Sequence, residues 1–385
     1  MKLLFASDSF KGSLSSKQTI ELLTKAAREV FGECETVGVP VADGGEGTVD
    51  AIVEAENGEM IRLKAHGPLM EEVSAFYGVF GDTAVIEMSA ASGLPLVPID
   101  KRNPMNTTTY GTGELILDAL DRGYRKLYLA IGGSATNDGG MGCVRALGGR
   151  FLDDKGKELD GFGRDLINVR DIDVTGLDER LKECSITVMC DVKNPLCGET
   201  GATMTFGAQK GATPEIQRLL EDGMCNYRDV IRKIYSVDCD KMQGAGAAGG
   251  LGAALSVFLG GGMKPGIEAV LDLIRFDERL EGVDIVVTGE GRTDWQSCFG
   301  KVMQGVGLRA KAKNIPVLGL SGSLGKNALD ICDYGVSSLM TTVNSPMSLE
   351  DALWNAETLY YEGAIRMFRF VKAGMEVGRR CDLRS

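Results

Sequence analysis

Histidine is almost absent from this chain, whose 385 residues contain only His66. A zinc site built on two histidines and a Ser–His–Asp triad are both hard to assemble from a single imidazole. The AHGP segment around it is typical of a turn, so we interpret His66 as a turn or surface residue. Any proton transfer would then fall to aspartate, glutamate, lysine, tyrosine or cysteine.

Long apolar runs and basic runs are also missing. The longest mostly apolar stretch, residues 251–263, is interrupted by Ser256 and glycines and is shorter than the ~18 residues that span a bilayer. The net charge is −12, and no long Lys/Arg run occurs. A nucleic-acid-binding protein normally carries a basic face. We therefore expect neither a membrane nor a nucleic acid as partner.

Cysteine is plentiful, but its spacing argues against a disulfide framework. None of the ten cysteines belongs to a CxxC pair, and the apolar run at residues 3–6 is too short for a secretory signal. We expect reduced, mostly buried thiols and a cytoplasmic protein.

Familiar nucleotide signatures are lacking too. No GxxxxGK[ST] sequence occurs, GSLGK at residues 322–326 is too short, and the HRD and DFG signatures of protein kinases are absent. GAGAAG at residues 244–249 matches GxGxxG, but the preceding VDCDKMQ is not a convincing strand. We expect these residues to open a tightly packed helix, with a hydride-transfer enzyme as a distant alternative.

Glycine is abundant, and it gathers in three loops that also carry carboxylates. The 52 glycines are about twice the usual share. PVADGGEGT (40–48), IGGSATNDGGMG (131–142) and VTGEGRTD (287–294) each follow a short apolar run and lead towards a helical pattern. Such junctions bind phosphate, and carboxylates among them make sense if Mg²⁺ lies between the two. The pattern predicts an enzyme that handles phosphate with a metal.

The order of apolar patterns predicts an α/β protein. We expect a doubly wound parallel sheet built from both ends of the chain, interrupted by a second α/β domain that has antiparallel strands between residues 60 and 88. Ligands of such sheets bind beyond the carboxyl ends of the strands. The residues expected just past strand ends are Asp8, Asp43, Gly132, Glu290 and Ser321.

Several loops hold candidate ligand-binding residues. In DSFKGS, Lys11 can neutralise a phosphate or carboxylate, while Asp8 orients it beside Ser9. In ADGGEGT, Asp43 and Glu46 flank paired glycines, a pattern that suits a metal or substrate. The polar residues of IGGSATNDGG are Ser134, Thr136, Asn137 and Asp138.

Two further loops combine acid with base. CDVKNPL places Asp191 and Lys193 directly after a strand, where Asp191 is a base, a metal ligand or simply a cap. TGEGRTD surrounds Gly291 with Glu290, Arg292 and Asp294, either an active cluster or a surface salt-bridge patch.

Taken in order, these motifs resemble the type I glycerate kinase family of bacteria. The resemblance runs through DSFKGSLSS, PVADGGEGT, EMSAASGLPLVP, RNPMNTTTYGTGELI, IGGSATNDGGMG, CDVKNPLCGETGA, GAGAAGGLGAAL and VTGEGRTD. It implies ATP-dependent phosphorylation of D-glycerate, with 2-phosphoglycerate the usual product. It leaves the oligomeric state open.

The resemblance also implies two α/β domains. One is flavodoxin-like, and we assign it residues 1–58, 107–149 and 266–385. The other is restriction-enzyme-like, and we assign it residues 59–106 and 150–265.

Roles for individual residues complete the hypothesis. Mg²⁺ would be held by some of Asp43, Asp191 and Glu290, and either Asp191 or Asp294 would accept the hydroxyl proton. Arg102 is the candidate for the glycerate carboxylate, because a guanidinium binds it through two hydrogen bonds. The residues expected to offset phosphate charge are Lys11, Arg292 and Lys301. The other expected contacts are Asp8, Ser9, Gly132, Gly133, Ser134, Asn137 and Lys193.

The chain departs from the family pattern in three places. Trp295 stands before QS where a smaller residue is usual, and Met303 and Ala208 stand where proline is common. A kinase of a related small hydroxy acid or sugar acid is therefore one alternative, and a ligand-binding protein without catalysis is another.

Overall fold

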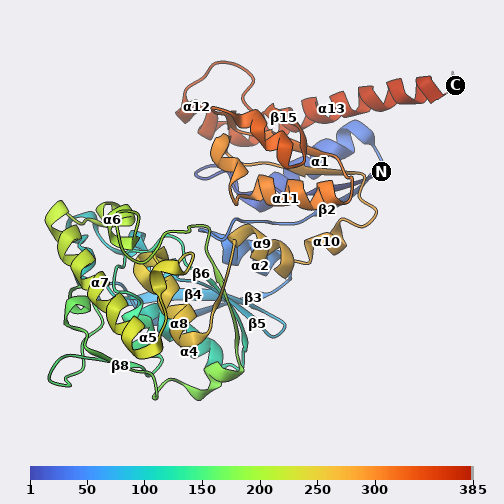
Figure 1. Cartoon of the computed structure of the whole chain (residues 1–385). Helices are drawn as coiled ribbons and strands as arrows, with labels where there is room; N and C mark the ends of the chain where they lie inside the picture. Colours follow the sequence, from blue (N-terminus) through green and yellow to red (C-terminus); the bar gives the residue numbers. More distant parts are fainter. Residues whose placement is uncertain (383–385) are drawn as a thin grey trace. The chain divides into compact units, whose positions relative to one another are not determined.

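The computed structural model describes residues 1–382 and divides into two compact units. Unit 1 combines Met1–Asp43 with the chain from Val270 onward, and unit 2 is Gly44–Ala269 (Figure 1). The protein is a mixed α/β structure with parallel sheets, as the alternating pattern predicts.

The sheet of unit 1 has five strands, all parallel, in the order β15-β13-β11-β1-β2. Counted along the chain within this unit, the order is 2-1-3-4-5. The interior strands β1 and β11 are almost entirely apolar and buried, as is typical of a parallel sheet covered on both faces. The strands are β1 (Lys2–Phe5), β2 (Glu35–Gly38), β11 (Ile285–Thr288), β13 (Val317–Ser321) and β15 (Val336–Thr341).

Helices α1 (Ser16–Phe31) and α13 (Ala356–Asp382) pack against each other in unit 1. Ser15 caps α1 by accepting from the backbone N–H of Gln18, whose side chain in turn accepts from the N–H of Ser15. This reciprocal capping box satisfies two donors at the helix start. The other helices are α10 (Phe276–Arg279), α11 (Val302–Ala312) and α12 (Leu349–Trp354), and the small strands are β12 (Arg292–Thr293) and β14 (Ser323–Leu324).

The sheet of unit 2 has six strands in the order β10-β9-β6-β5-β4-β3. The first four run parallel, whereas β3, β4 and β5 pair antiparallel, which confirms the expectation for residues 60–88. The strands are β3 (Glu59–His66), β4 (Glu72–Phe80), β5 (Thr83–Glu87), β6 (Lys126–Ala130), β9 (Ser185–Met189) and β10 (Gly262–Lys264). Strands β7 (Arg150–Leu152) and β8 (Asp171–Asp173) form a separate small antiparallel pair.

The longest helix of unit 2 begins with a capping threonine followed by a proline. Helix α7 runs over Pro214–Tyr235, with Thr213 as its cap and proline at its first position, where the missing N–H costs nothing. Helix α9 (Gly266–Leu273) contains the boundary between the units. The remaining helices are α2 (Thr48–Ala55), α3 (Ser89–Ser92), α4 (Tyr110–Asp121), α5 (Met141–Ala146), α6 (Ala202–Phe206) and α8 (Leu251–Leu259).

The structure differs from the expected domain limits. Residues 44–58 and 107–149 lie in unit 2 rather than with the two chain ends. The reason is strand pairing, since β6 pairs with β5 on one side and with β9 on the other. Hydrophobic patterning identifies β6 as a buried strand but does not identify its neighbours.

GAGAAG does not follow a strand, as the sequence indicated. The 3-10 helix Cys239–Lys241 precedes it, and its last residues lead directly into α8. The chain there packs against the loop of IGGSATNDGG, because the amide of Gly139 donates to the carbonyl of Gly249 at 2.9 Å. These glycines allow close packing. Because a dinucleotide-binding fingerprint directly follows a strand, this segment does not match one.

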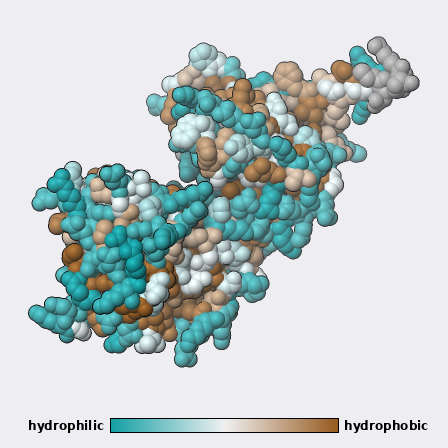
Figure 2. Space-filling view, in the orientation of Figure 1, coloured by the Kyte–Doolittle hydropathy of each residue, from teal (hydrophilic) through white to brown (hydrophobic). Residues whose placement is uncertain are grey.

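His66 ends β3, and its Nδ1 lies 2.8 Å from Glu114 Oε1. Every cysteine with a described side chain is a free thiol. Among the described residues, no helix is both long and apolar enough to cross a membrane. Figure 2 shows hydrophilic side chains over much of the visible surface, with smaller apolar patches between them.

Candidate active site

Unit 1 has a pocket at the carboxyl end of its sheet. Strand β1 leads to Asp8 and β11 leads to Glu290, and the Asp8 amide donates to the Gly289 carbonyl at 2.9 Å. In a 2-1-3-4-5 sheet the strand order reverses between these two strands, so their loops diverge and leave a crevice. A pocket of about 830 Å³ lies there, lined by both carboxylates.

Three carboxylates line this pocket: Asp8, Asp43 and Glu290. Burial, together with the charges of Asp43 and Glu290, raises the pKa of Asp8 to about 7, although the Ser9 amide and Lys11 oppose the shift. Glu290 is 7% exposed, and burial raises its pKa as well, although Ser297 and Thr293 donate hydrogen bonds to its Oε1. Carboxylates gathered in this way are costly unless a cation joins them, and their oxygens are the ligands that Mg²⁺ prefers.

Cationic side chains share the same pocket. Lys11 and Arg292 are exposed, and Lys301 Nζ lies 3.9 Å from Glu290 Oε2. Ser9 also lines it and donates its amide to Asp8 Oδ1 at 2.6 Å. The apolar part of the pocket comes from the chain around α12, with Met347, Leu349, Ala352, Leu353 and Tyr360. The pocket thus offers a charged end and an apolar wall.

Asp294 has a structural task that its sequence context did not reveal. It caps the 3-10 helix Trp295–Cys298, with Oδ1 accepting from the Gln296 amide at 2.9 Å, and Oδ2 lies 3.5 Å from Arg292 Nε. It is not among the residues that line the pocket. Its carboxylate is already engaged at both oxygens.

The unusual Trp295 and Met303 lie outside the pocket lining as well. Trp295 is 49% exposed and packs edge-on against Phe299, with 6.0 Å between ring centres. Met303 is fully buried, and its sulfur lies 3.1 Å from Thr293 Oγ1. Ala208, the third departure, begins the 3-10 helix Ala208–Lys210 in unit 2.

In unit 2, three of the predicted loops meet beyond the carboxyl ends of β6, β9 and β10. Gly44 has φ +90°, and a Cβ there would lie 2.7 Å from Gly266 Cα. The Gly266 amide donates to Asp191 Oδ1 at 2.8 Å. A Cβ on Gly132 would lie 3.8 Å from Gly45 Cα. The loops that carry ADGG, IGG and CDVK therefore contact one another or share the neighbour Gly266.

The other predicted residues of unit 2 lie around these loops. Asp191 and Lys193 are exposed. Gly133 has φ +72° and accepts at its carbonyl from the Leu94 amide. Arg102 follows the 3-10 helix Ile99–Lys101 and donates from Nε to the Val97 carbonyl at 3.4 Å, so it is tied to its own loop.

Sequence reasoning missed Lys210, which holds the IGGSATNDGG loop from inside. Its Nζ donates to Ser134 Oγ at 2.8 Å and to the Thr136 carbonyl at 2.7 Å, and the residue is 2% exposed. Burial lowers the pKa of Lys210 to about 7. Asn137 is buried in the same loop and donates from Nδ2 to Thr203 Oγ1 at 3.1 Å. The one available signal for Lys210 was a lone lysine within FGAQKGA.

Asp138 is a structural carboxylate rather than a ligand directed outward. It is fully buried and accepts from the amide and hydroxyl of Thr109 at 2.7 and 2.8 Å and from the amides of Gly140 and Gly142. Burial raises its pKa, and these donors oppose that shift.

We expect Asp138→Asn to lower the free energy of unfolding by about 2–3 kcal/mol, because one carboxylate oxygen becomes an NH₂ that faces N–H donors. Urea unfolding followed by fluorescence measures this change. The exposed Asp154→Asn is the control and should change stability by less than about 0.5 kcal/mol. Equal stability of the two variants would contradict the structural role of Asp138.

Known proteins match this chain along nearly its whole length. Residues 3–372 match the Glycerate kinase family. Glycerate kinase of Bacillus subtilis (strain 168) is 47% identical over 358 residues, which is 92% of this chain and 94% of the relative. Glycerate 2-kinase of Escherichia coli (strain K12) is 45% identical over 383 residues, 99% of each chain. A crystal structure assigned as glycerate kinase 2 of Salmonella typhimurium LT2 superposes with a TM-score of 0.89 at 44% identity and covers 98% of this chain and 99% of its own.

Proposed function

Because the chain belongs to the glycerate kinase family, we propose that it transfers the γ-phosphoryl group of ATP to a hydroxyl of D-glycerate, releasing ADP and 2-phosphoglycerate. It is thus a phosphotransferase with an alcohol group as acceptor. The observation that best supports this activity is the pocket of unit 1, where Asp8, Asp43 and Glu290 occur with Lys11, Arg292 and Lys301.

The acidic end of the pocket fits Mg²⁺. Asp43 and Glu290 would hold the ion, and Asp8 would join them because it lines the same pocket and its burial beside Asp43 makes a cation favourable there. When bound, Mg²⁺ would neutralise charge on the phosphates of ATP. Lys11, Arg292 and Lys301 would offset the remaining phosphate charge, and the Ser9 hydroxyl and the apolar wall would position the nucleotide.

For proton transfer we favour Asp191 over Asp294. The acceptor hydroxyl attacks phosphorus as the bond to the leaving ADP oxygen breaks, and its proton passes to a carboxylate. Asp191 is exposed and lies just after β9, whereas Asp294 caps a 3-10 helix and does not line the pocket of unit 1. Asp191 is also a candidate metal ligand. Its position just after β9 fits the role of base and the role of metal ligand equally well.

The acceptor requires groups that recognise a small hydroxy acid. We assign its carboxylate to Arg102, which can bind it through two parallel hydrogen bonds. Further contacts would come from Lys193, from the backbone of Gly132 and Gly133, and from Ser134. Lys210 positions Ser134 and Asn137 supports the same loop, so these two residues act through it.

Finer features of the fold and location belong to the same proposal. The 2-1-3-4-5 strand order of unit 1 is that of flavodoxin-like sheets, which supports that description. For unit 2 we retain the restriction-enzyme-like description that the resemblance implies. The free thiols support a reducing compartment, and we place the protein in the cytoplasm.

The direct test is ³¹P NMR of the purified protein with Mg·ATP and D-glycerate. We expect ADP together with one new phosphomonoester signal, whose proton coupling identifies the phosphorylated oxygen as O2. Parallel samples without glycerate, without Mg²⁺ and with L-glycerate are the controls. Release of inorganic phosphate without a phosphomonoester would contradict the proposal, and coupling to a CH₂ group would move the product to the 3-phosphate.

A further inference from the structure

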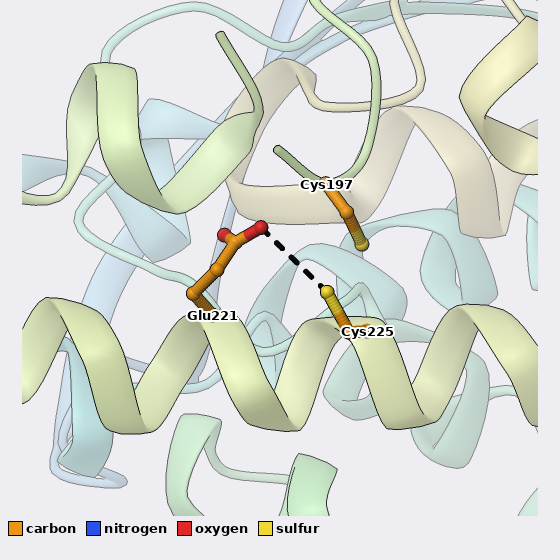
Figure 3. A group of neighbouring side chains, drawn as sticks. All are labelled: Cys197, Glu221 and Cys225. Carbon is orange, nitrogen blue, oxygen red and sulfur yellow. Dashed lines mark hydrogen bonds between the residues drawn. The ribbon is translucent and has the colours of Figure 1, made fainter. Parts of the chain in front are cut away.

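Unit 2 contains a second cluster of ligand-type side chains that the kinase reaction does not use. It consists of Cys197, in the loop after β9, and of Glu221 and Cys225 on α7 (Figure 3). One ligand atom from each residue lies within 4.8 Å of the others. In Figure 3 the two sulfur atoms and the Glu221 carboxylate face a common centre.

Local structure brings these three residues together. Glu221 and Cys225 are four residues apart, so they share one face of α7. The loop is held against that face because the amide of Gly198, next to Cys197, donates to Glu221 Oε1 at 2.6 Å. Cys197 is buried, and the other two side chains are partly buried. The cluster is therefore built into the fold and does not depend on mobile surface side chains.

The spacing suits a tetrahedral ion. Cys225 Sγ lies 3.7 Å from Glu221 Oε1. Metal–sulfur and metal–oxygen bonds of ~2.3 and ~2.1 Å at a tetrahedral angle put the two ligand atoms roughly 3.6 Å apart. An ion can therefore enter with little movement of α7.

The charges around the cluster also favour a bound cation. Glu221 Oε2 is buried and has no hydrogen-bond partner among the described residues, which is unfavourable for a carboxylate oxygen. Arg228, one turn further along α7, pairs with Asp240, which also accepts from the Cys197 amide. Arg228 also pairs with Asp229, so its charge is engaged by two carboxylates outside the three-residue cluster.

We propose that Cys197, Glu221 and Cys225 form a binding site for a thiophilic divalent cation, with Zn²⁺ as the ion of the cell and water at the fourth position. Two sulfur ligands exclude Mg²⁺, which takes oxygen ligands. The site is separate from the pocket of unit 1 and does not rest on the proposed reaction. A bound ion would link α7 to the loop that continues from Asp191.

The test uses the reduced full-length protein and two spectroscopic probes, Co²⁺ and Cd²⁺. We expect one equivalent of Co²⁺ to give the visible bands of tetrahedral coordination with thiolate-to-metal charge transfer, and Zn²⁺ to displace it. Cys197→Ser and Cys225→Ser should each weaken binding by at least about 100-fold and Glu221→Gln by about tenfold. Cys184→Ser is the matched control, because Cys184 is another partly buried thiol of unit 2 and lies outside the cluster.

Thermal unfolding provides a second readout. Saturating Zn²⁺ should raise the midpoint of the wild type and of Cys184→Ser by about 5 °C and leave the Cys197→Ser, Cys225→Ser double variant unchanged. No stoichiometric binding at micromolar metal, or binding that persists in the double variant, would overturn the proposal. Recovery of a Cys197–Cys225 disulfide from protein that binds no metal after reduction would overturn it as well, in favour of a redox pair.

Discussion

Asp191→Asn is expected to lower kcat by about 10³, because a carboxylate that accepts a proton in the transition state contributes ~10²–10⁴ to the rate. Asparagine keeps the shape of the side chain and an oxygen that can accept from the Gly266 amide. The loop should therefore stay folded, and KM for ATP and glycerate should change by less than about threefold. Steady-state ADP release at several concentrations of both substrates measures the two parameters separately.

Asp294→Asn is the matched comparison for this prediction. Because Asp294 caps the 3-10 helix Trp295–Cys298, its replacement should cost about 1 kcal/mol of stability or less and leave kcat within about threefold of the wild type. If the two variants exchanged these properties, Asp294 would be the base. If both kept full turnover, neither carboxylate would accept the proton.

Asp8→Asn is expected to change activity and stability in opposite directions. Asparagine cannot supply the negative charge that Mg²⁺ requires, so kcat/KM for Mg·ATP should fall by about 10². The same substitution removes a buried carboxyl group whose ionisation is unfavourable in the folded protein. Activity assays over a range of Mg²⁺ concentrations should show a higher Mg²⁺ requirement for the variant.

The stability effect depends on pH in a defined direction. The pKa of Asp8 is about 7 in the folded protein and 3.8 in the reference state. Between these values the unfolded chain has lost the proton while the folded chain keeps it, so stability falls as pH rises from about 4 to 7. Without Mg²⁺, Asp8→Asn should therefore be more stable than the wild type by roughly 2–4 kcal/mol at pH 8 and equally stable at pH 4.

Denaturant unfolding at the two pH values, with and without Mg²⁺, tests this prediction. Asp330→Asn serves as the control, because Asp330 is an exposed aspartate of the same unit. It should show no pH-dependent gain. If Asp8→Asn were no more stable than the wild type at pH 8, the folded protein would already stabilise the ionised Asp8 carboxylate, and the prediction would be wrong. Added Mg²⁺ should stabilise the wild type more than the Asp8 variant.

The Asp8 prediction depends on the pocket of unit 1, and part of that pocket was predictable from the sequence. The apolar run at residues 3–6 marked β1, and Asp8 and Glu290, expected just past strand ends, follow β1 and β11. Of the residues expected just past strand ends, Asp8, Asp43 and Glu290 line one pocket, whereas Gly132 lies in unit 2. These features are local, since they follow from periodicity, capping and the known polarity of parallel sheets.

Other features were decided only when distant segments came together. The pairing of β6 between β5 and β9 put residues 107–149 in unit 2. Burial turned Asp138 into a loop anchor and placed Lys210 beneath Ser134.

The sequence by itself thus determined the α/β class and the family, because helix and strand periods, glycine turns and motifs are written in neighbouring residues. The tertiary structure alone decided which carboxylate is exposed and which one caps a helix, as with Asp191 and Asp294, and which thiols meet, as with Cys197 and Cys225. The physical reason is that burial, hydrogen-bond partners and ligand-type clusters depend on contacts between residues far apart in the chain, which no local pattern records.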